Sequence, residues 1–378
     1  MAVVSAGHLF TDVSQGAVPA LLPFLKSDMH LSYAAVSTLV LAATISSSVI
    51  QPVFGRYSDR RSLPHLMPLG VLFGGLGIAA VGIAPSYGLV FLAIVVSGIG
   101  VAAFHPEGSR FANYLSGSRR ASGMSLFSVG GNVGFALGPL LVTPLLLAFG
   151  LHGTLFMAVP AALMALVLVH ELPRLLTFRH AAAKRLARAD VRDDWNAFVR
   201  LGAVVAMRSF VYFGLVTFVP LYYVAHLNTS KAAGNTALAA MLAAGAVGTL
   251  IGGPAADRFG RRPVVIASMT LLPPLIVAFA AAGQGLATLL IAIVGAATIV
   301  TFSVTVVMGQ EYLPGRIGVA SGFTLGLSIG LGGVAAPLLG LVADHWGLTT
   351  TFHVIAALPL VGLLVALTLP RGRERGSA

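Results

Sequence analysis

The chain has 378 residues, of which 57% are hydrophobic and only 9% are charged. Soluble domains carry about 25% charged residues, so this composition excludes a soluble globular protein and predicts one integral membrane domain. A formal net charge of +11 alone would suit a nucleic-acid-binding protein, and the absence of cysteine excludes a disulfide framework and a thiolate metal site.

Twelve apolar windows follow one another along the chain, separated by charge clusters, Pro/Gly turns or short polar gaps. At roughly 20 residues per membrane-spanning helix, a dozen helices use about 240 residues and leave short connections. The sequence therefore predicts an all-α integral membrane protein with transmembrane helices at 3–25, 34–56, 65–83, 87–112, 120–149, 151–172, 197–226, 232–256, 263–282, 285–311, 316–345 and 348–369. The N-terminal stretch lacks the basic region and cleavage site of a signal peptide and is expected to begin the first helix.

The basic residues are distributed unevenly between the two faces of this predicted bundle. One face receives 20 of the 23 Lys and Arg residues, in the connections after the even-numbered helices, whereas the opposite face keeps only Lys26 and Lys231. Because cytoplasmic loops of membrane proteins are enriched in Lys and Arg, both termini are predicted in the cytoplasm. The same distribution argues against a nucleic-acid partner.

An internal repeat divides the chain into two halves. The loop "GRYSDRR" at 55–61 returns as "GPAADRFGRR" at 253–262, which places Asp59 and Asp257 198 residues apart. Pro139 and Pro337, in a second repeated motif, have the same separation. Two six-helix halves related by duplication are typical of secondary transporters.

The predicted domain boundaries follow from this repeat. We expect an N-terminal six-helix half at 1–172 and a C-terminal six-helix half with a short basic tail at 197–378. The segment 173–196 is the long polar connection between them, and it is predicted to be a cytoplasmic linker near anionic lipid.

These motifs carry a resemblance to a known family. The repeated loop resembles the G-x-x-x-D-R-x-G-R-R loop of the major facilitator superfamily. Within that superfamily the chain is similar to the fosmidomycin resistance family of bacterial drug exporters, in the segments "GHLFTDVSQGAVPALLPFL", "FHPEGSRFA", "SVGGNVGFALGPL", "MRSFVYFGLVTFVPLYY" and "GQEYLPGRIGVASG". The resemblance implies the major facilitator fold, with helices 1, 4, 7 and 10 around a central cavity, and proton-coupled antiport.

The chain departs from the family patterns in two places. The first loop reads "SLP" where the pattern has Gly-Arg-Arg, and helix 5 keeps Gly134, Gly138 and Pro139 of the antiporter signature without the Gly pair that follows. We expect the loops to gate the transporter, because a carboxylate and a guanidinium at cytoplasmic helix ends can pair across helices and hold one access state shut. The predicted gating residues are Gly55, Asp59, Arg60, Gly253, Asp257, Arg258, Gly260 and Arg261.

Isolated ionisable residues mark every third predicted helix. A charge at the bilayer centre costs about 2.5–3.5 kcal/mol on the mildest scale, so such groups normally face a wet cavity and mark a pathway. We predict that Asp12 and Glu107 carry proton coupling, with His8 and His105 either relaying the proton or satisfied by a neighbouring oxygen. Arg110 lies one turn from Glu107, within reach as a partner.

Arg208 is the candidate for substrate recognition. It lies deep in helix 7, where no acid occurs, so its partner is predicted to be Glu311, Asp12 or a bound anion. The guanidinium fork suits a phosphonate or carboxylate. The predicted substrate-binding residues are Arg208, Tyr212, Phe213, Gln15, Asn132, Arg110 and Glu311.

The sequence as a whole predicts a proton-coupled secondary transporter in the bacterial inner membrane, a drug/proton antiporter that exports small anionic or amphiphilic compounds such as fosmidomycin-like phosphonates. An importer or symporter of a small metabolite, or a non-transporting membrane sensor, remains an alternative. Metal-ligand spacings, a nucleophile elbow and a P-loop are absent, which argues against an enzyme. We expect a monomer in the lipid bilayer whose partners are protons and a small-molecule substrate, with no cofactor and no metal.

Overall fold

The structure is a computed structural model that describes residues 1–60, 63–116, 120–178, 193–316, 319–320, 323–324 and 328–370, without the side chains of 52, 55–60, 120–122, 315 and 328. These ranges contain helices and no strand. Most of the predicted linker and the basic tail lie outside the described residues. The first half consists of α1 (Ala2–Asp28), α2 (Tyr33–Arg60), α3 (Leu66–Val81), α4 (Tyr87–Leu115), α5 (Arg120–Phe149), a 3₁₀ turn at Gly150–Met157 and α6 (Ala158–Thr177). The second consists of α7 (Trp195–Ala225), α8 (Lys231–Phe259), α9 (Arg261–Ala281), α10 (Gln284–Ile299), α11 (Phe302–Tyr312), a 3₁₀ turn at Pro314–Arg316 and α13 (Ser328–Ala366).

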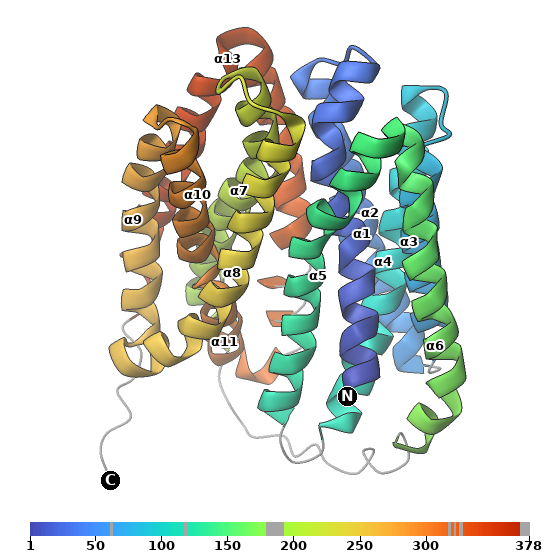
Figure 1. Ribbon diagram of the computed structural model, residues 1–378. Helices are drawn as coiled ribbons and strands as arrows, with labels where there is room; N and C mark the ends of the chain where they lie inside the picture. The colour runs from blue at the N-terminus through green and yellow to red at the C-terminus, as the bar shows by residue number, and fades with distance from the viewer. Residues whose placement is uncertain are drawn as a thin grey trace.

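The two sets of helices form two adjacent bundles (Figure 1), with α7–α13 on the left and α1–α6 on the right. Eight stretches of the described chain are long and apolar enough to span a membrane. Two of these, Gly123–Thr177 and Ile329–Ala366, have 55 and 38 residues and each contains two spans. Adding α1 and the shorter apolar helix α3 accounts for the twelve predicted spans.

One predicted helix is divided in the structure, and one predicted boundary is confirmed. The predicted tenth helix, 285–311, is interrupted at Val300 and Thr301 and is therefore two helices, α10 and α11. The boundary predicted between the last two helices lies within α13, where the non-helical Gly347, with φ at 80°, separates two helices. Glycine tolerates this positive φ because it has no Cβ.

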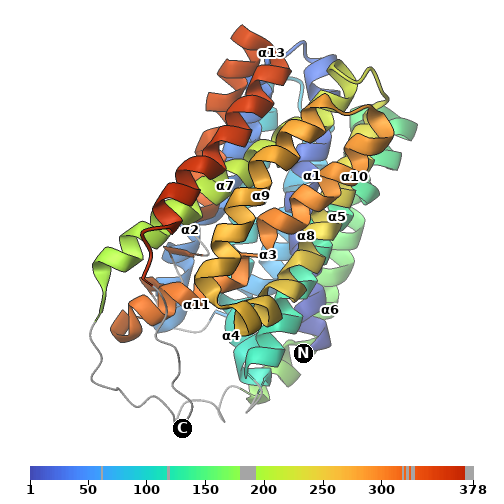
Figure 2. The same cartoon turned by 90° about the vertical axis from the view of Figure 1, so that its left-hand side faces the viewer.

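The protein has two ends, which we name by the helices that begin or end there. We call the linker end the one where α1 begins and α6 ends, and the far end the one where α1 ends and α2 begins (Figures 1 and 2). Arg200, near the start of α7, donates to the carbonyl of Thr368 at 2.9 Å, and Arg262, at the start of α9, donates to that of Leu367 at 2.6 Å. The end of α13 therefore lies at the same end of the second bundle as the start of α7.

Glycines allow α1 and α5 to pack backbone to backbone. A Cβ added at Gly16 would lie 2.0 Å from the Phe135 carbonyl oxygen, and one at Gly134 would lie 2.1 Å from the Leu9 carbonyl oxygen. A Cβ added at Gly138 would lie 2.5 Å from the Ala17 backbone nitrogen of α1. Close approach of this kind is the usual reason for small residues between membrane helices.

Polar contacts join the two bundles from the far end to the middle. Asp344 of α13 accepts hydrogen bonds from the backbone N–H groups of Tyr33 at 2.7 Å and Ala34 at 2.9 Å, at the start of α2. Asn235 of α8 donates to the Ala20 carbonyl of α1 at 3.0 Å. Lys231 of α8 lies 4.0 Å from Asp28 of α1. These contacts hold the far end of the two halves together.

Candidate functional site

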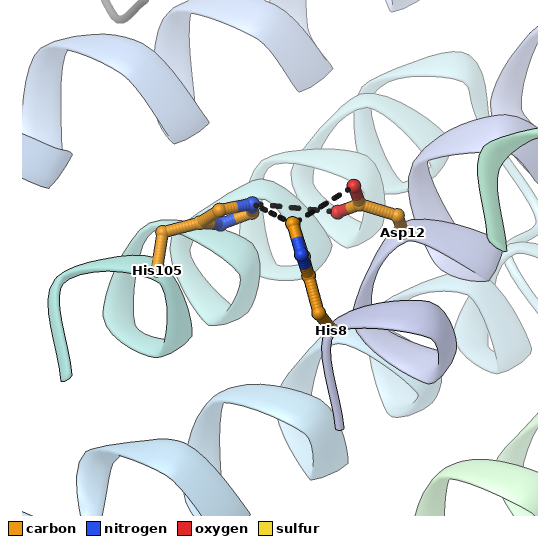
Figure 3. Close-up of side chains that lie close together, drawn as sticks. All are labelled: His8, Asp12 and His105. Atoms are coloured by element: carbon orange, nitrogen blue, oxygen red, sulfur yellow. Dashed lines mark hydrogen bonds and ion pairs between the residues drawn. The ribbon is translucent and has the colours of Figure 1, made fainter. Parts of the chain in front are cut away.

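Three ionisable side chains from α1 and α4 converge inside the first bundle (Figure 3). His8 and Asp12 share one face of α1 because they are four residues apart, and His105 approaches from α4. Asp12 Oδ2 lies 3.3 Å from His8 Nε2, and Asp12 Oδ1 lies 3.5 Å from His105 Nε2. The two Nε2 atoms are 3.2 Å apart. We refer to His8, Asp12 and His105 as the histidine–aspartate cluster.

The Nδ1 atoms of both imidazoles already have hydrogen-bond partners, which are backbone carbonyl oxygens. His8 Nδ1 lies 2.7 Å from the Phe127 carbonyl oxygen, and His105 Nδ1 lies 2.8 Å from that of Val101. A carbonyl only accepts, so each Nδ1 carries the hydrogen, and in a neutral imidazole the other nitrogen is then an acceptor. Two Nε2 lone pairs and a carboxylate therefore face one another without a donor. Only a bound proton or another cation between them makes this arrangement attractive.

The neighbouring α5 leaves just enough space for this cluster. A Cβ on Gly131 would lie 2.5 Å from His8 Nε2 and 2.7 Å from Asp12 Oδ2. The ring of Phe127 stacks on His8 with centroids 4.0 Å apart. His8 is buried, whereas the side chains of Asp12 and His105 keep 14% and 22% of their surface exposed. The cluster is thus packed on one side and accessible on the other.

The cluster is also the set of side chains best suited to hold a cation. Its three ligand atoms lie within 4.8 Å of one another. Two imidazole nitrogens and one carboxylate suit a divalent transition metal, and their second nitrogens have the backbone partners that metal-binding histidines usually have. Chemically, the cluster can therefore hold a proton or a metal ion.

Arg208 of α7 is 3% exposed and lacks an acidic partner among the described residues. Its Nε has no hydrogen-bond partner, and its guanidinium carbon lies 5.3 Å from the centre of the Phe302 ring. Glu311, one of the predicted partners of Arg208, pairs instead with Arg261 at 2.6 Å and is half exposed. Asp12 is engaged by the two histidines. Of the three predicted partners of Arg208, only a bound anion is left.

The other predicted pocket residues lie between the halves. Gln15 of α1 and Phe213 of α7 line the same small cavity of about 10 Å³, which has room for a single water. Tyr212 packs against Phe213 and Phe135, with ring centres 5.3 and 6.4 Å away. Asn132 of α5 lies 3.5 Å from the Thr249 hydroxyl of α8. These side chains fill the contact between the halves in the conformation described.

Glu107, the other residue predicted to carry proton coupling, is bonded to the backbone of the α2–α3 connection in this conformation. It is fully buried, and its Oε1 accepts a hydrogen bond from the Leu63 backbone N–H at 2.9 Å. The predicted Arg110 partner lies 3.4 Å from the same oxygen. Residues two positions apart on a helix point about 200° apart, so Glu107 and His105 cannot line the same surface of α4. Glu107 instead fastens the α2–α3 connection to α4.

The predicted gating loops are described only in part. The side chains of Gly55, Asp59 and Arg60 lie outside the described residues. In the second loop, Gly260 ends α8 with φ at 87°, and Gly253 has open space around it. The side chains of Asp257 and Arg258 are exposed, and no described carboxylate or guanidinium pairs with them. Among the described side chains, the predicted pair of a carboxylate and a guanidinium across helices is not formed.

The sequence did not single out two contributors to these sites, Gly131 and Phe302. Gly131 is the position that gives the cluster its space. Phe302 and Ser303 lie at the break in the tenth span, where neither proline nor glycine signals an interruption.

The family model, the related sequences and the solved structures that the chain resembles all point to the same family. The sequence matches the Major Facilitator Superfamily over residues 4–230 and 201–378. It is 33% identical to the Escherichia coli (strain K12) fosmidomycin resistance protein over 381 residues, which cover 99% of this chain and 93% of that protein. It is also 33% identical over 380 residues to the uncharacterized MFS-type transporter YfnC of Bacillus subtilis (strain 168), with 98% and 93% covered. Among solved structures, the inward open xylose transporter XylE of E. coli superposes with a TM-score of 0.78 at 13% identity, over 99% of this chain and 96% of that one.

Proposed function

The chain belongs to the major facilitator superfamily of membrane transporters, and we propose that it is a proton-driven antiporter that exports small anionic compounds from the bacterial cytoplasm. The observation that carries the proposal is the histidine–aspartate cluster, in which three acceptors meet without a donor. A proton is the smallest ligand that makes the cluster stable. The family is expected to be non-enzymatic, and energy for export then comes from the proton gradient.

Coupling follows from the position of the charged groups on opposite halves. Asp12, His8 and His105 belong to the first half, and Arg208 belongs to the second. Transporters of this fold alternate access by moving one half against the other around a fixed site. A proton bound at the cluster and an anion bound at Arg208 therefore shift the same equilibrium between the access states. Proton uptake in the cluster favours one access state, and an anion on Arg208 favours the other.

The substrate class follows from the guanidinium of Arg208. A buried cation without an acidic partner is costly, and an anionic ligand removes that cost. The relative at 33% identity is named for resistance to fosmidomycin, a phosphonate. A guanidinium binds such oxyanions through two parallel N–H donors. We therefore take fosmidomycin-like phosphonates as the test substrates.

Orientation follows from the basic residues. Most of the Arg and Lys residues that the structure describes lie at the linker end, so we place this end in the cytoplasm, with both termini inside. We propose further that the protein is a monomer in the inner membrane. In this orientation the far end faces outward, and the loops with Asp59 and Asp257 face inward. The carboxylates of these loops gate the inward side in the state that closes it.

Transport in proteoliposomes tests the proposal. Purified protein is reconstituted with a pH-sensitive dye inside, and fosmidomycin uptake and lumen pH are followed together after a proton gradient is imposed. Asp12→Asn should lose gradient-driven accumulation and its linked proton flux while retaining fosmidomycin binding. Asp28→Asn is the matched control, since Asp28 lies on the same helix at the far end and is 46% exposed. It should transport normally.

Two results would contradict this function. Asp12→Asn that still moves protons in step with fosmidomycin would remove the cluster from coupling. Gradient-driven transport that is abolished in wild-type protein by a membrane-permeant chelator, and restored by a stoichiometric divalent metal, would assign the cluster to a metal ion instead of a proton.

A further inference from the structure

The three side chains of the histidine–aspartate cluster are spaced like the ligands of one metal ion. The two Nε2 atoms are 3.2 Å apart, and they lie 3.3 and 3.5 Å from the two oxygens of Asp12. In a tetrahedral site, zinc lies about 2.0–2.2 Å from imidazole nitrogen and carboxylate oxygen, so neighbouring ligand atoms are about 3.3–3.6 Å apart. The cluster therefore has nearly the dimensions of one face of such a tetrahedron. A small rotation of the carboxylate is enough to bring a single oxygen to the ion.

The lone pairs of the cluster point at the place where the ion would lie. Both Nδ1 atoms are bonded to backbone carbonyls, so both Nε2 lone pairs are directed at Asp12. Asp12 Oδ1 is buried and has no hydrogen-bond partner among the described residues. Buried polar atoms are normally satisfied, so an orphaned carboxylate oxygen beside two lone pairs indicates a ligand. A proton joins two of these groups at a time, whereas one metal ion binds all three.

The surroundings of the cluster also suit a metal ion. The carbonyls of Phe127 and Val101 fix the orientation of the imidazoles, as the outer partners of metal-binding histidines do. On one side α5 closes the cluster at Gly131, where a Cβ would lie 2.5 Å from His8 Nε2. On the other side the partly exposed Asp12 and His105 leave a fourth position for water. Three protein ligands and one water are a common zinc environment.

We propose that the histidine–aspartate cluster binds one divalent transition metal ion of the zinc type, and that this ion inhibits transport. The metal and the coupling proton need the same lone pairs, so a bound metal excludes the proton. Inhibition rests on the proposed function of the cluster, whereas metal binding does not. The sequence predicted no metal because it lacks a metal-ligand spacing, and it could not show that α4 supplies a third ligand to a pair on α1.

Metal binding to the purified full-length protein tests the inference directly. The protein is freed of any affinity tag, stripped with a chelator and titrated with Zn²⁺ by calorimetry. It is titrated separately with Co²⁺, whose visible absorption distinguishes tetrahedral from octahedral coordination. We expect one ion per chain and the tetrahedral spectrum.

Variants identify the ligands. His105→Gln should weaken Zn²⁺ binding at least about 100-fold and abolish the Co²⁺ spectrum, because losing a ligand costs more than the 10- to 100-fold loss typical of an outer partner. Asp12→Asn should have a similar effect, so the assignment does not depend on the folding of one variant. His353→Gln is the matched control, since His353 is exposed on α13, and it should bind Zn²⁺ as wild type does.

The consequence for transport is measured in the proteoliposomes described above. Zn²⁺ should stop gradient-driven fosmidomycin transport at the concentrations that saturate the calorimetric site, and a chelator should restore it. The Asp28→Asn control, which keeps the cluster, should be inhibited to the same extent.

The outcomes separate this inference from the proposed function. Wild-type protein that binds no ion, or that binds it equally well in His105→Gln and Asp12→Asn, overturns this inference and leaves the proton-coupled function standing. Zn²⁺ that binds at the cluster while transport continues at the full rate overturns the inhibitory role, and it removes the cluster from coupling as well. Transport that requires the metal overturns both inhibition and proton coupling.

Discussion

Asp344 is predicted to control how readily the far end opens. Its two carboxylate oxygens accept from the first two N–H groups of α2, at Tyr33 and Ala34, across the boundary between the halves. Ser32 satisfies the next free donor, the N–H of Ala35, at 3.1 Å. The far-end state is thus held by a helix cap that one half supplies to the other, and opening must break it.

The cost of losing this cap follows from its geometry. Removing a side-chain cap costs about 0.5–2 kcal/mol, and a negative charge at a helix start contributes about 0.3–1 kcal/mol. Asp344→Asn keeps one acceptor oxygen, places an amide N–H against a backbone donor, and loses the charge. Because the bonds are solvent-exposed, we expect a net loss of about 1–2 kcal/mol, which shifts the access equilibrium about 5- to 30-fold toward the far-end-open state.

Spin-label distances measure this shift directly, since the chain has no native cysteine. Labels at Ser86→Cys and Gln284→Cys report on the two halves, because both residues are exposed and precede or begin helices at the far end. Asp344→Asn should add or enlarge a population at longer distance. Asp28→Asn is the control, as its 4.0 Å contact with Lys231 is worth under about 1 kcal/mol. Identical distance distributions in wild type and Asp344→Asn would refute the reasoning.

Three further predictions concern the cluster, the α2–α3 connection and the orientation. Gly131→Ala should displace the histidine–aspartate cluster and uncouple transport from the proton gradient, whereas Gly88→Ala, whose added Cβ meets nothing within 4 Å, should behave as wild type in the same proteoliposome assay. Glu107→Gln should lower the thermal unfolding midpoint, as expected for a loss of about 1–3 kcal/mol at a buried bond to a charged group, and leave the proton-to-substrate ratio unchanged; a changed ratio would restore its predicted coupling role. Single cysteines at Ser27 and Thr177, both exposed, should react with a membrane-impermeant reagent only from outside and only from inside the cell, respectively, and the reverse pattern would invert the topology.

The fold was predictable because the membrane restricts it so strongly. A lipid-exposed backbone must satisfy its own hydrogen bonds, so length and hydropathy are enough to locate helices. The duplication then shows which helix of the first half corresponds to which helix of the second half. The break at Val300 and Thr301 was not predictable, because these residues propagate a helix as readily as their neighbours. The break is visible only in the backbone of the structure, as the turn between α10 and α11.

The sequence predicts which site residues share a face of one helix. It does not predict which residues of different helices meet. The spacing of His8 and Asp12 places them on one face of α1, but the contribution of His105 depends on how α1 packs against α4. Glu107 illustrates the opposite case. Its distance of two residues from His105 already places it on another side of α4.

One turn of α4 is therefore attached to its neighbours at two residues, and the two attachments must move together. His105, on one side, faces Asp12 at 3.5 Å and is joined to it by a proton in the function proposed above, and Glu107, on the other side, holds the backbone of the α2–α3 connection. A rigid helix cannot move one without the other. Departure of the cation would release α4 from α1, and the resulting rotation would pull on the connection that follows the first gating loop. Ion occupancy deep in the membrane would then be transmitted as motion to the linker-end surface, where a partner or lipid could sense it.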